Sequence, residues 1–219
     1  RRALDAAYGL VRPSNNDLDP SRSVSQHFYV LRAGAETIGN VSDATLARGL
    51  ESAVRALLDQ IHPRHPRFVD KATRSKLEAE LELVRKLVET DGQRLPLSKA
   101  ELGALVFADA LGLVTVRDAQ ATLRHETYDE LERRLRAEGH DLPEVRHVKA
   151  AFQRGGSWGL TAEVADFVVL VYATVKGREV LRAGRAVEGV QLGKLDADAE
   201  LSQPELAGEA DWHRALDVA

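Results

Sequence analysis

The sequence predicts a mainly α-helical protein of the α+β class, with a few short strands. Apolar residues recur at steps of three and four over several long stretches, which is typical of helices with one buried face. The alternating or β-branched runs are much shorter, as strands of a small sheet are. With 219 residues, of which 44% are hydrophobic and 29% charged, the chain falls in the ordinary globular range and can bury a sizeable core.

These patterns divide the chain into four regions. We expect an irregular N-terminal segment with a short strand over residues 1–43, a first helical unit over 44–118, a second, winged-helix-like helical unit over 119–194, and an acidic segment over 195–219. In the first region, turn signals such as Pro13–Asp17 surround one alternating stretch, His27–Leu31. That stretch is the predicted strand.

The first helical unit begins with two amphipathic helices. One has Ser42 or Asp43 as N-cap and ends before Pro63, and the next ends at Gly92. Their apolar stripes are Leu46, Leu50, Val54, Leu57 and Ile61 in the first helix, and Leu77, Leu81, Val84 and Val88 in the second. A bend with two X-Pro dipeptides separates them, and this bend lets Phe68 reach the core.

A third helix in this unit begins with a capping box. The Ser98 hydroxyl can accept from the Glu101 amide while the Glu101 carboxylate reaches back to the Ser98 backbone. The helix is expected to run to Leu111, with Gly112 as the residue that ends it. The β-branched run Leu113–Val116 then predicts a short strand.

The second helical unit has three predicted helices and a strand. A charged helix ends at Gly139, another starts at Pro143, and Thr161 caps the most apolar helix, Ala162 to about Thr174. The inward positions of the first two are Tyr128, Leu131 and Leu135, then Val145, Val148 and Phe152. The stretch Glu179–Arg182 reads as a wing strand.

A weak internal repeat links the two units. Residues 100–107 align with residues 162–169, and in both copies a capped helix precedes a glycine-containing link and a short strand. Two related winged-helix-like units would produce this pattern, and so would two unrelated small α+β modules. The apolar helix itself fails as a recognition helix, because it lacks an exposed face of Arg, Asn, Gln or Ser.

Composition excludes several classes of protein. The longest apolar run, Phe167–Ala173, is far shorter than the ~20 residues of a transmembrane helix, so we expect no membrane contact. The absence of cysteine excludes disulfides, thiolate zinc sites and cysteine nucleophiles, and a cytoplasmic location is the default expectation. Because the chain has no Met and begins with two arginines, we expect it to be a piece of a longer protein.

Charge is distributed unevenly along the chain. The net charge is -4, but the segment after Leu195 has seven acidic residues against Arg214, which leaves about +2 for the remainder. These acids are Asp196, Asp198, Glu200, Glu205, Glu209, Asp211 and Asp217. They lack the spacing of a calcium loop or a catalytic pair, and they indicate a solvated segment anchored by Trp212 and Leu216.

No catalytic motif is present in the sequence. The segment Gly189–Lys194 ends in a Gly-Lys pair, but it lacks the first glycine of a phosphate-binding loop and the Ser or Thr that should follow the lysine. There is also no GxSxG, HExxH or GxGxxG motif. We therefore expect no catalytic residue, no metal and no cofactor in this segment.

The most basic stretch lies at the start of the second helix. It contains Arg64, Arg67, Lys71, Arg74 and Lys76, together with His62 and His65, against a single acid, Asp70. Such a run can neutralise nucleic-acid phosphates, whereas the simpler interpretation is a solvated helix start. The two histidines could pair on a metal, but the prolines between them oppose a shared helix face.

A second group of candidate contact residues surrounds the predicted wing. It consists of Arg154, Trp158, Arg178, Arg182 and Arg185. The arginines suit nucleic acid or a partner protein, while Trp158 either stacks on a base or, as we favour, covers the core.

Three segments resemble one protein family. They are Ile61–Phe68, the capped apolar helix in Gly159–Ala173, and Gly177-Arg178 with the further Gly184. They resemble the region C-terminal to the ATPase domain in the large P-loop proteins of phage growth limitation and BREX defence systems, the PglY and BrxC type. The resemblance implies that a parent protein binds ATP and Mg²⁺ and acts in antiviral defence, while this segment is non-catalytic.

Two functions from different classes follow. The first is an interaction module of a defence ATPase, contacting partner subunits of a defence complex or DNA. The second is an independent winged-helix-like transcription regulator or a small helical binding protein.

Overall fold

The structure is a computed structural model that describes residues 46–99, 101, 103–154, 158–187 and 189–204. These residues form two compact units: residues 46–65 with 158–159, and the remainder. The strand predicted at His27–Leu31, the N-cap at Ser42 or Asp43 and the anchors Trp212 and Leu216 lie outside the described residues. None of the described helices is long and apolar enough to cross a membrane.

The first unit contains α2, Leu46–Ile61. The helix ends two residues before Pro63, as predicted, because proline cannot continue a helix without losing a hydrogen bond. Its apolar stripe is present but incompletely covered. Ala53 is buried at 4% exposure, whereas Leu50 and Val54 are 52% and 45% exposed.

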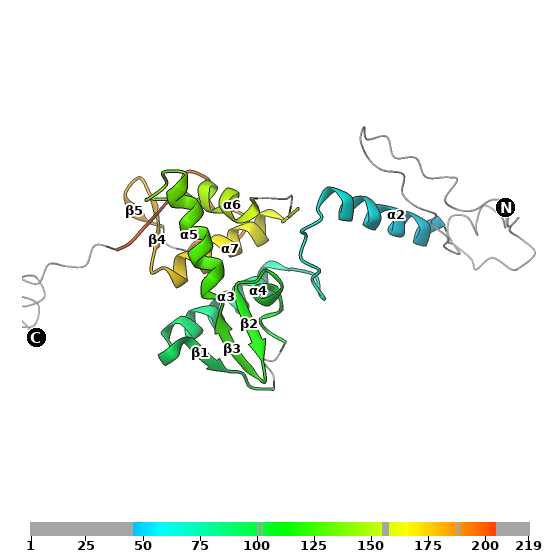
Figure 1. The fold of residues 1–219 in the computed structure, drawn as a ribbon, viewed down its shortest axis with the longest axis horizontal. Coiled ribbons are helices and arrows are strands. Elements are labelled where there is room, and N and C mark those ends of the chain that lie inside the picture. The colour runs from blue at the N-terminus through cyan, green and yellow to red at the C-terminus, as the bar shows by residue number, and fades with distance from the viewer. Residues whose placement is uncertain (1–45, 100, 102, 155–157, 188, 205–219) are drawn as a thin grey trace, which may run out of the picture. The chain divides into compact units, whose positions relative to one another are not determined.

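The second unit is built around one buried helix. Its helices are α3 (Arg74–Glu89), α4 (Val106–Ala110), α5 (His125–Ala137), α6 (Val145–Gln153) and α7 (Ala162–Val175) (Figure 1). α7 is buried from Val164 through Ala173, and both α3 and α6 pack against it. Thr161 caps it as predicted, since its hydroxyl accepts from the Val164 N–H at 3.5 Å.

The predicted stripes of the other helices are largely confirmed. Tyr128, Leu131 and Leu135 are the buried positions of α5, and Val145, Val148 and Phe152 are buried on α6. Phe68, at the end of the proline bend, packs edge-on against Phe107, with ring centroids 5.1 Å apart and planes at 79°. Apolar periodicity therefore located the core of this unit.

The helix predicted from Ser98 to Leu111 is much shorter in the structure. α4 begins only at Val106, and the described residues before it form turns. The Glu101 carboxylate accepts from the Ser98 N–H at 3.0 Å, but the Ser98 hydroxyl donates to the same carboxylate at 2.6 Å. That hydroxyl therefore does not cap the Glu101 amide, so only half of the predicted capping box forms.

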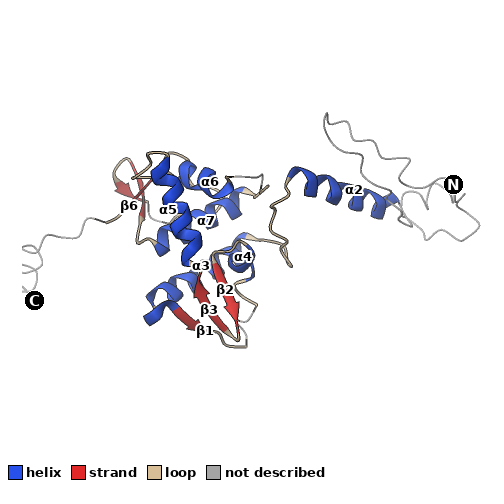
Figure 2. Ribbon diagram, in the orientation of Figure 1, coloured by secondary structure: helices blue, strands red, loops and turns tan. Residues whose placement is uncertain are grey.

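The first sheet is antiparallel with strand order β1-β3-β2 (Figure 2). Its strands are β1 (Arg94–Pro96), β2 (Val114–Arg117) and β3 (Gln120–Leu123). β2 matches the predicted strand within one residue, whereas β1 and β3 were not predicted. Asp118 and Ala119 form the two-residue turn between β2 and β3, with positive φ of 50° and 59°.

The second sheet, also antiparallel, has the order β5-β4-β6. Its strands are β4 (Glu179–Arg182), which is the predicted wing strand, β5 (Arg185–Ala186) and β6 (Glu200–Ser202). The expectation of a solvated segment after residue 195 is wrong for β6, because Leu201 pairs opposite Val180 and is fully buried.

The two copies of the internal repeat differ in structure. Residues 162–169 are helical throughout, whereas the helix of the other copy starts at Val106. Each helix is nevertheless followed by a glycine of positive φ, Gly112 or Gly177, and then by a strand. The boundary predicted at residue 118 falls in the β2–β3 turn. The winged-helix assignment stays a prediction.

Candidate functional site

The predicted basic stretch spans both units of the chain. Arg64 lies in the first unit, and the other four cations lie in the second. Arg64, Arg67, Lys71 and Lys76 are exposed, while Arg74 is half-buried. Four of the five cations therefore belong to one unit, from Pro66 onward.

Two of these cations are neutralised by neighbouring acids. Lys76 pairs with Asp70, and the Arg74 Nε lies 2.9 Å from a Glu78 carboxylate oxygen. The Lys76 ammonium and the Lys71 backbone N–H hold the pKa of Asp70 below its usual value. Arg67 and Lys71 form no ion pair with any described residue, so their charge is the more available for an external anion.

His62 and His65 hold a turn of the first unit. The His65 Nδ1–H donates to the Trp158 carbonyl at 2.7 Å, and a Cβ at Gly159 would lie 2.5 Å from the His62 ring. Glycine is therefore required there, both for this contact and for its φ of +59°. Within the described ranges, no group of three or more His, Asp or Glu side chains could hold a metal ion.

The arginines near the predicted wing differ sharply in exposure. Arg154 is exposed and pairs with Glu138 at 2.8 Å, and Arg182 is exposed and pairs with Asp196 at 3.3 Å. Arg185, on β5, is exposed as well. Arg154, Arg182 and Arg185 are therefore accessible to a partner.

Arg178 is part of the protein interior. Its side chain is only 11% exposed, donates to the Leu201 carbonyl at 3.0 Å and lies 3.4 Å from the Glu132 carboxylate. The Tyr172 hydroxyl donates to the same carboxylate, and burial is the main cause that raises the pKa of Tyr172. This network joins α5, α7 and β6, which favours a structural role for Arg178.

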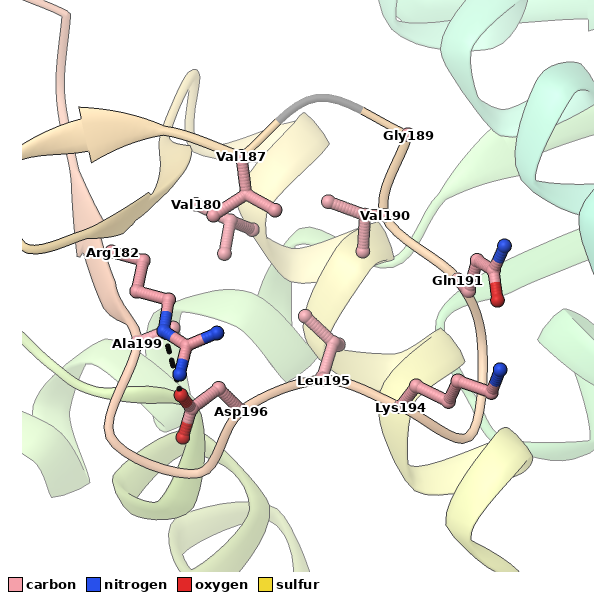
Figure 3. Close-up of a pocket in the computed structure, with 10 residues that line it drawn as sticks. All are labelled: Val180, Arg182, Val187, Gly189, Val190, Gln191, Lys194, Leu195, Asp196 and Ala199. Carbon is pink, nitrogen blue, oxygen red and sulfur yellow. Dashed lines mark ion pairs between the residues drawn. The ribbon is translucent and has the colours of Figure 1, made fainter.

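An open apolar groove lies beside β4 (Figure 3). Figure 3 shows Val180, Val187, Val190 and Leu195 converging on its centre, with the Arg182–Asp196 pair at one side. The cavity measures about 230 Å³, and an adjoining one of about 290 Å³ shares its three valines. We call this combined surface the valine groove. Gln191 and Lys194 lie at the other side of it in Figure 3.

Sequence reasoning missed the valine groove. Most of its lining comes from residues 178–199, which the pairing of β4 with β5 and β6 brings together, and the adjoining cavity adds Arg85 and the end of α7. Gly189–Lys194, considered above as a degenerate phosphate-binding loop, forms part of this lining. The described residues after Lys194 form turns and then β6, so no helix N-terminus follows the Gly-Lys pair.

A buried carboxyl group, Glu80, was also missed. It is 2% exposed and accepts hydrogen bonds from the backbone N–H groups of Phe107 and Ala108 at 3.0 and 2.9 Å. Burial raises the pKa of Glu80 to about 7, against the opposing effect of these hydrogen bonds. The sequence does contain a sign of this buried acid, because Glu80 falls within the apolar stripe of Leu77, Leu81 and Val84.

A second buried acid, Asp166, lies on α7. It is 1% exposed, and Lys149 Nζ lies 2.5 Å from one of its oxygens. The other oxygen accepts from the backbone N–H groups of Gly193 and Leu195 at 2.7 and 3.0 Å. Asp166 therefore anchors one wall of the valine groove, and an Asp inside an otherwise apolar helix was the signal for it.

The buried acids and the apolar groove together are typical of a structural scaffold with a surface that can bind a partner. Glu80, Asp166 and Glu132 are each committed to backbone or side-chain partners inside the fold. The described lining of the valine groove contains no histidine, and its two acids are Glu179 and Asp196, of which Asp196 is paired with Arg182. What this surface can do chemically is hold apolar side chains beside the cations Arg182 and Lys194.

Comparison with known families gives a match to part of the chain. Residues 75–173 match the model of the fifth domain of the PglY protein, a BREX system ATPase. No curated protein and no solved structure matches the chain. The match runs from α3 into α7, so the segments at Ile61–Phe68 and from Gly177 onward lie outside it. The resemblance to PglY-type ATPases is confirmed, because residues 75–173 are similar to the fifth domain of the PglY ATPase of BREX systems.

Proposed function

We propose that this chain contains a non-catalytic interaction module of a BREX phage-defence ATPase, which contacts a partner subunit of the defence complex through the valine groove. The observation that carries the proposal is the groove itself, an open apolar surface beside β4. Apolar pockets of this kind accept anchor side chains from a partner, and burial of one large side chain contributes about 1.5–3 kcal/mol. Lys194, which forms no ion pair with a described residue, favours a partner segment that also carries an acidic residue.

The non-catalytic part of the proposal rests on how the ionisable groups are used. The buried acids stabilise the fold, and the glycines near Lys194 lie in a loop that no helix follows among the described residues. Binding of ATP and Mg²⁺ is assigned to another part of the parent protein, as the family description of an ATPase suggests.

The experiment is co-purification of the full-length parent protein with the other subunits of the same BREX system. Val187→Asp places a charge in the groove, at a position 37% exposed, where the fold tolerates it. We expect this variant to lose at least tenfold in affinity for one subunit while its ATPase rate is unchanged. Val69→Asp is the matched control, because Val69 is 95% exposed and outside the groove. Equal binding by both variants would contradict the proposal.

A second candidate function is a DNA-binding regulator. The observation in its favour is that β-hairpins follow both α4 and α7, in the position of a wing, although α7 is buried and cannot itself read a groove. A Walker A motif upstream in the same reading frame supports the first candidate, and a start codon directly before residue 1 supports the second.

A further inference from the structure

The first sheet has one buried face and one exposed face. Val114, Ala121 and Leu123 are buried, and α3 and α4 contact the strands. The register of the strands defines the opposite face. Thr122 on β3 lies between Arg94 on β1 and Thr115 on β2. In the same way, Gln120 on β3 lies between Pro96 on β1 and Arg117 on β2. Cross-strand partners, and residues two apart on a strand, lie on the same face. We call these six residues the sheet face.

The sheet face is polar and positively charged. Arg94, Arg117 and Gln120 are exposed, Thr115 and Thr122 are half-buried, and none of the six residues is an acid. The acids nearest in sequence, Asp91 and Asp118, lie in the turns beyond its two ends. Neither Arg94 nor Arg117 forms an ion pair within the described part of the chain, although most other arginines of the second unit do.

We infer that the sheet face is a contact surface for the phosphate backbone of a nucleic acid. Arg, Thr and Gln are side chains that contact phosphate and sugar oxygens, and a positive face complements a phosphodiester chain. A protein partner is disfavoured, because protein interfaces are anchored by aromatic or large apolar residues, and Pro96 is the largest apolar residue here. The inference is independent of the proposed function, which uses the second sheet.

The spacing of the two arginines indicates which contacts they make. They lie two strands apart and two residues apart along the strands, so their Cα atoms are separated by roughly 12 Å, given ~4.8 Å between strands and ~3.4 Å per residue. This exceeds the ~3.4 Å rise between successive phosphates of one DNA strand. Arg94 and Arg117 can therefore reach different phosphates, and we expect each to supply one contact. Because backbone contacts carry no sequence information, binding is expected to be independent of sequence.

The test is a fluorescence-anisotropy titration of the whole chain with labelled duplex and single-stranded DNA of unrelated sequences, from about 50 to about 200 mM salt. We expect R94Q/R117Q to weaken binding equally for all sequences. The slope of log K against log salt should flatten by about 2, since each lost phosphate contact contributes ~0.9. R94K/R117K keeps both charges, so it should retain most of that slope.

The control variant is R133Q/R136Q, which removes the same charge from exposed positions on α5 that belong to no candidate contact group. An unchanged slope in R94Q/R117Q, an equal loss in the control, or no DNA binding by the unmodified chain would each overturn the inference. Polyglutamate is added as a competitor at matched charge. If it displaces DNA from the sheet face as well as unlabelled DNA does, the face is a site for acidic protein and the nucleic-acid assignment is wrong.

Discussion

Glu80 brings a carboxyl group into the core of the second unit, where the N-terminus of α4 receives it. The backbone N–H groups of Phe107 and Ala108 are otherwise unsatisfied at that helix end, so the side chain replaces a local N-cap. Burial disfavours the charged form and raises the pKa of Glu80 to about 7, from an ordinary value near 4.5. Near neutral pH the group is therefore close to half protonated.

This pKa makes the stability of the fold dependent on pH. Between about pH 4.5 and about 7, the folded protein holds a proton at Glu80 that the unfolded chain has released, so the free energy of unfolding falls as the pH rises. The shift corresponds to about 3 kcal/mol across this interval. Glu80→Gln is neutral at every pH, so it should abolish this fall. Urea unfolding at about pH 5 and about pH 8 measures the difference.

Glu80→Gln should also be less stable than the unmodified protein at both pH values. The Gln amide has only one acceptor oxygen for the two backbone N–H groups, so its NH₂ group faces one of them. A buried N–H left without an acceptor lowers the free energy of unfolding by about 1–3 kcal/mol. Glu82→Gln on the exposed side of the same helix is the control and should keep the pH dependence. If Glu80→Gln retained the full fall, another group would be responsible.

At the scale of elements, α4 shows how a short helix is held from both ends. A five-residue helix is not stable alone, because the conformational entropy lost in nucleation exceeds the stabilisation from its one or two hydrogen bonds. Glu80 caps its N-terminus, and at its C-terminus Gly112 donates to Asp109 while Leu113 donates to Ala108, both at 2.9 Å. This is the Schellman arrangement, which needs a left-handed residue at Gly112, with its φ of +71°.

Replacing Gly112 by Ala tests that requirement. A residue with a Cβ in the left-handed region costs about 1–2 kcal/mol, and this Cβ would also lie 3.2 Å from the Arg124 guanidinium. We expect a corresponding loss in the free energy of unfolding, measured in urea. Gly103→Ala is the matched control, since Gly103 has no positive φ and open space around it, and it should be neutral or slightly stabilising. Equal losses in both variants would refute the argument.

The helices were predictable where one stripe of apolar residues meets the core, as in α5 with Tyr128, Leu131 and Leu135. β1 and β3 were not predictable, because the turn that joins β2 to β3 is Asp118-Ala119 and lacks the glycine or asparagine that usually signals a hairpin. The sheet face was missed for the same reason. It exists only once β1 and β3 are aligned with β2.

The candidate site shows the same limit. Arg182 was predicted as a contact residue and lines the valine groove, whereas the valines around it were not considered. Arg178 and Arg182 were predicted together from the same local charge. In the structure, Arg178 belongs to a buried network, whereas Arg182 is exposed. Local charge does not reveal burial, which depends on partners such as Glu132 that are distant in sequence.

For the whole molecule, the distribution of charge decides which surfaces can attract an anion. The net charge of -4 gives no general attraction to nucleic acid, so any such binding depends on local clusters of unneutralised cations. Most arginines of the second unit are paired with acids, as Arg154 is with Glu138 and Arg146 is with both Glu144 and Asp198. Arg67 and Lys71 in the basic stretch resemble the sheet face in lacking such pairs.

The basic stretch therefore has its own expected signature. If it touches DNA, replacing Arg64, Arg67, Lys71 and Arg74 by Gln should flatten the salt slope by roughly 2 to 4, because each of two to four lost phosphate contacts contributes ~0.9. Stability should change by no more than about 1 kcal/mol, since exposed ion pairs contribute little. The same anisotropy titration used for R94Q/R117Q measures this slope in parallel. An unchanged slope here, together with a flattened one in R94Q/R117Q, would leave the basic stretch as a solvated helix start and the sheet face as the DNA contact.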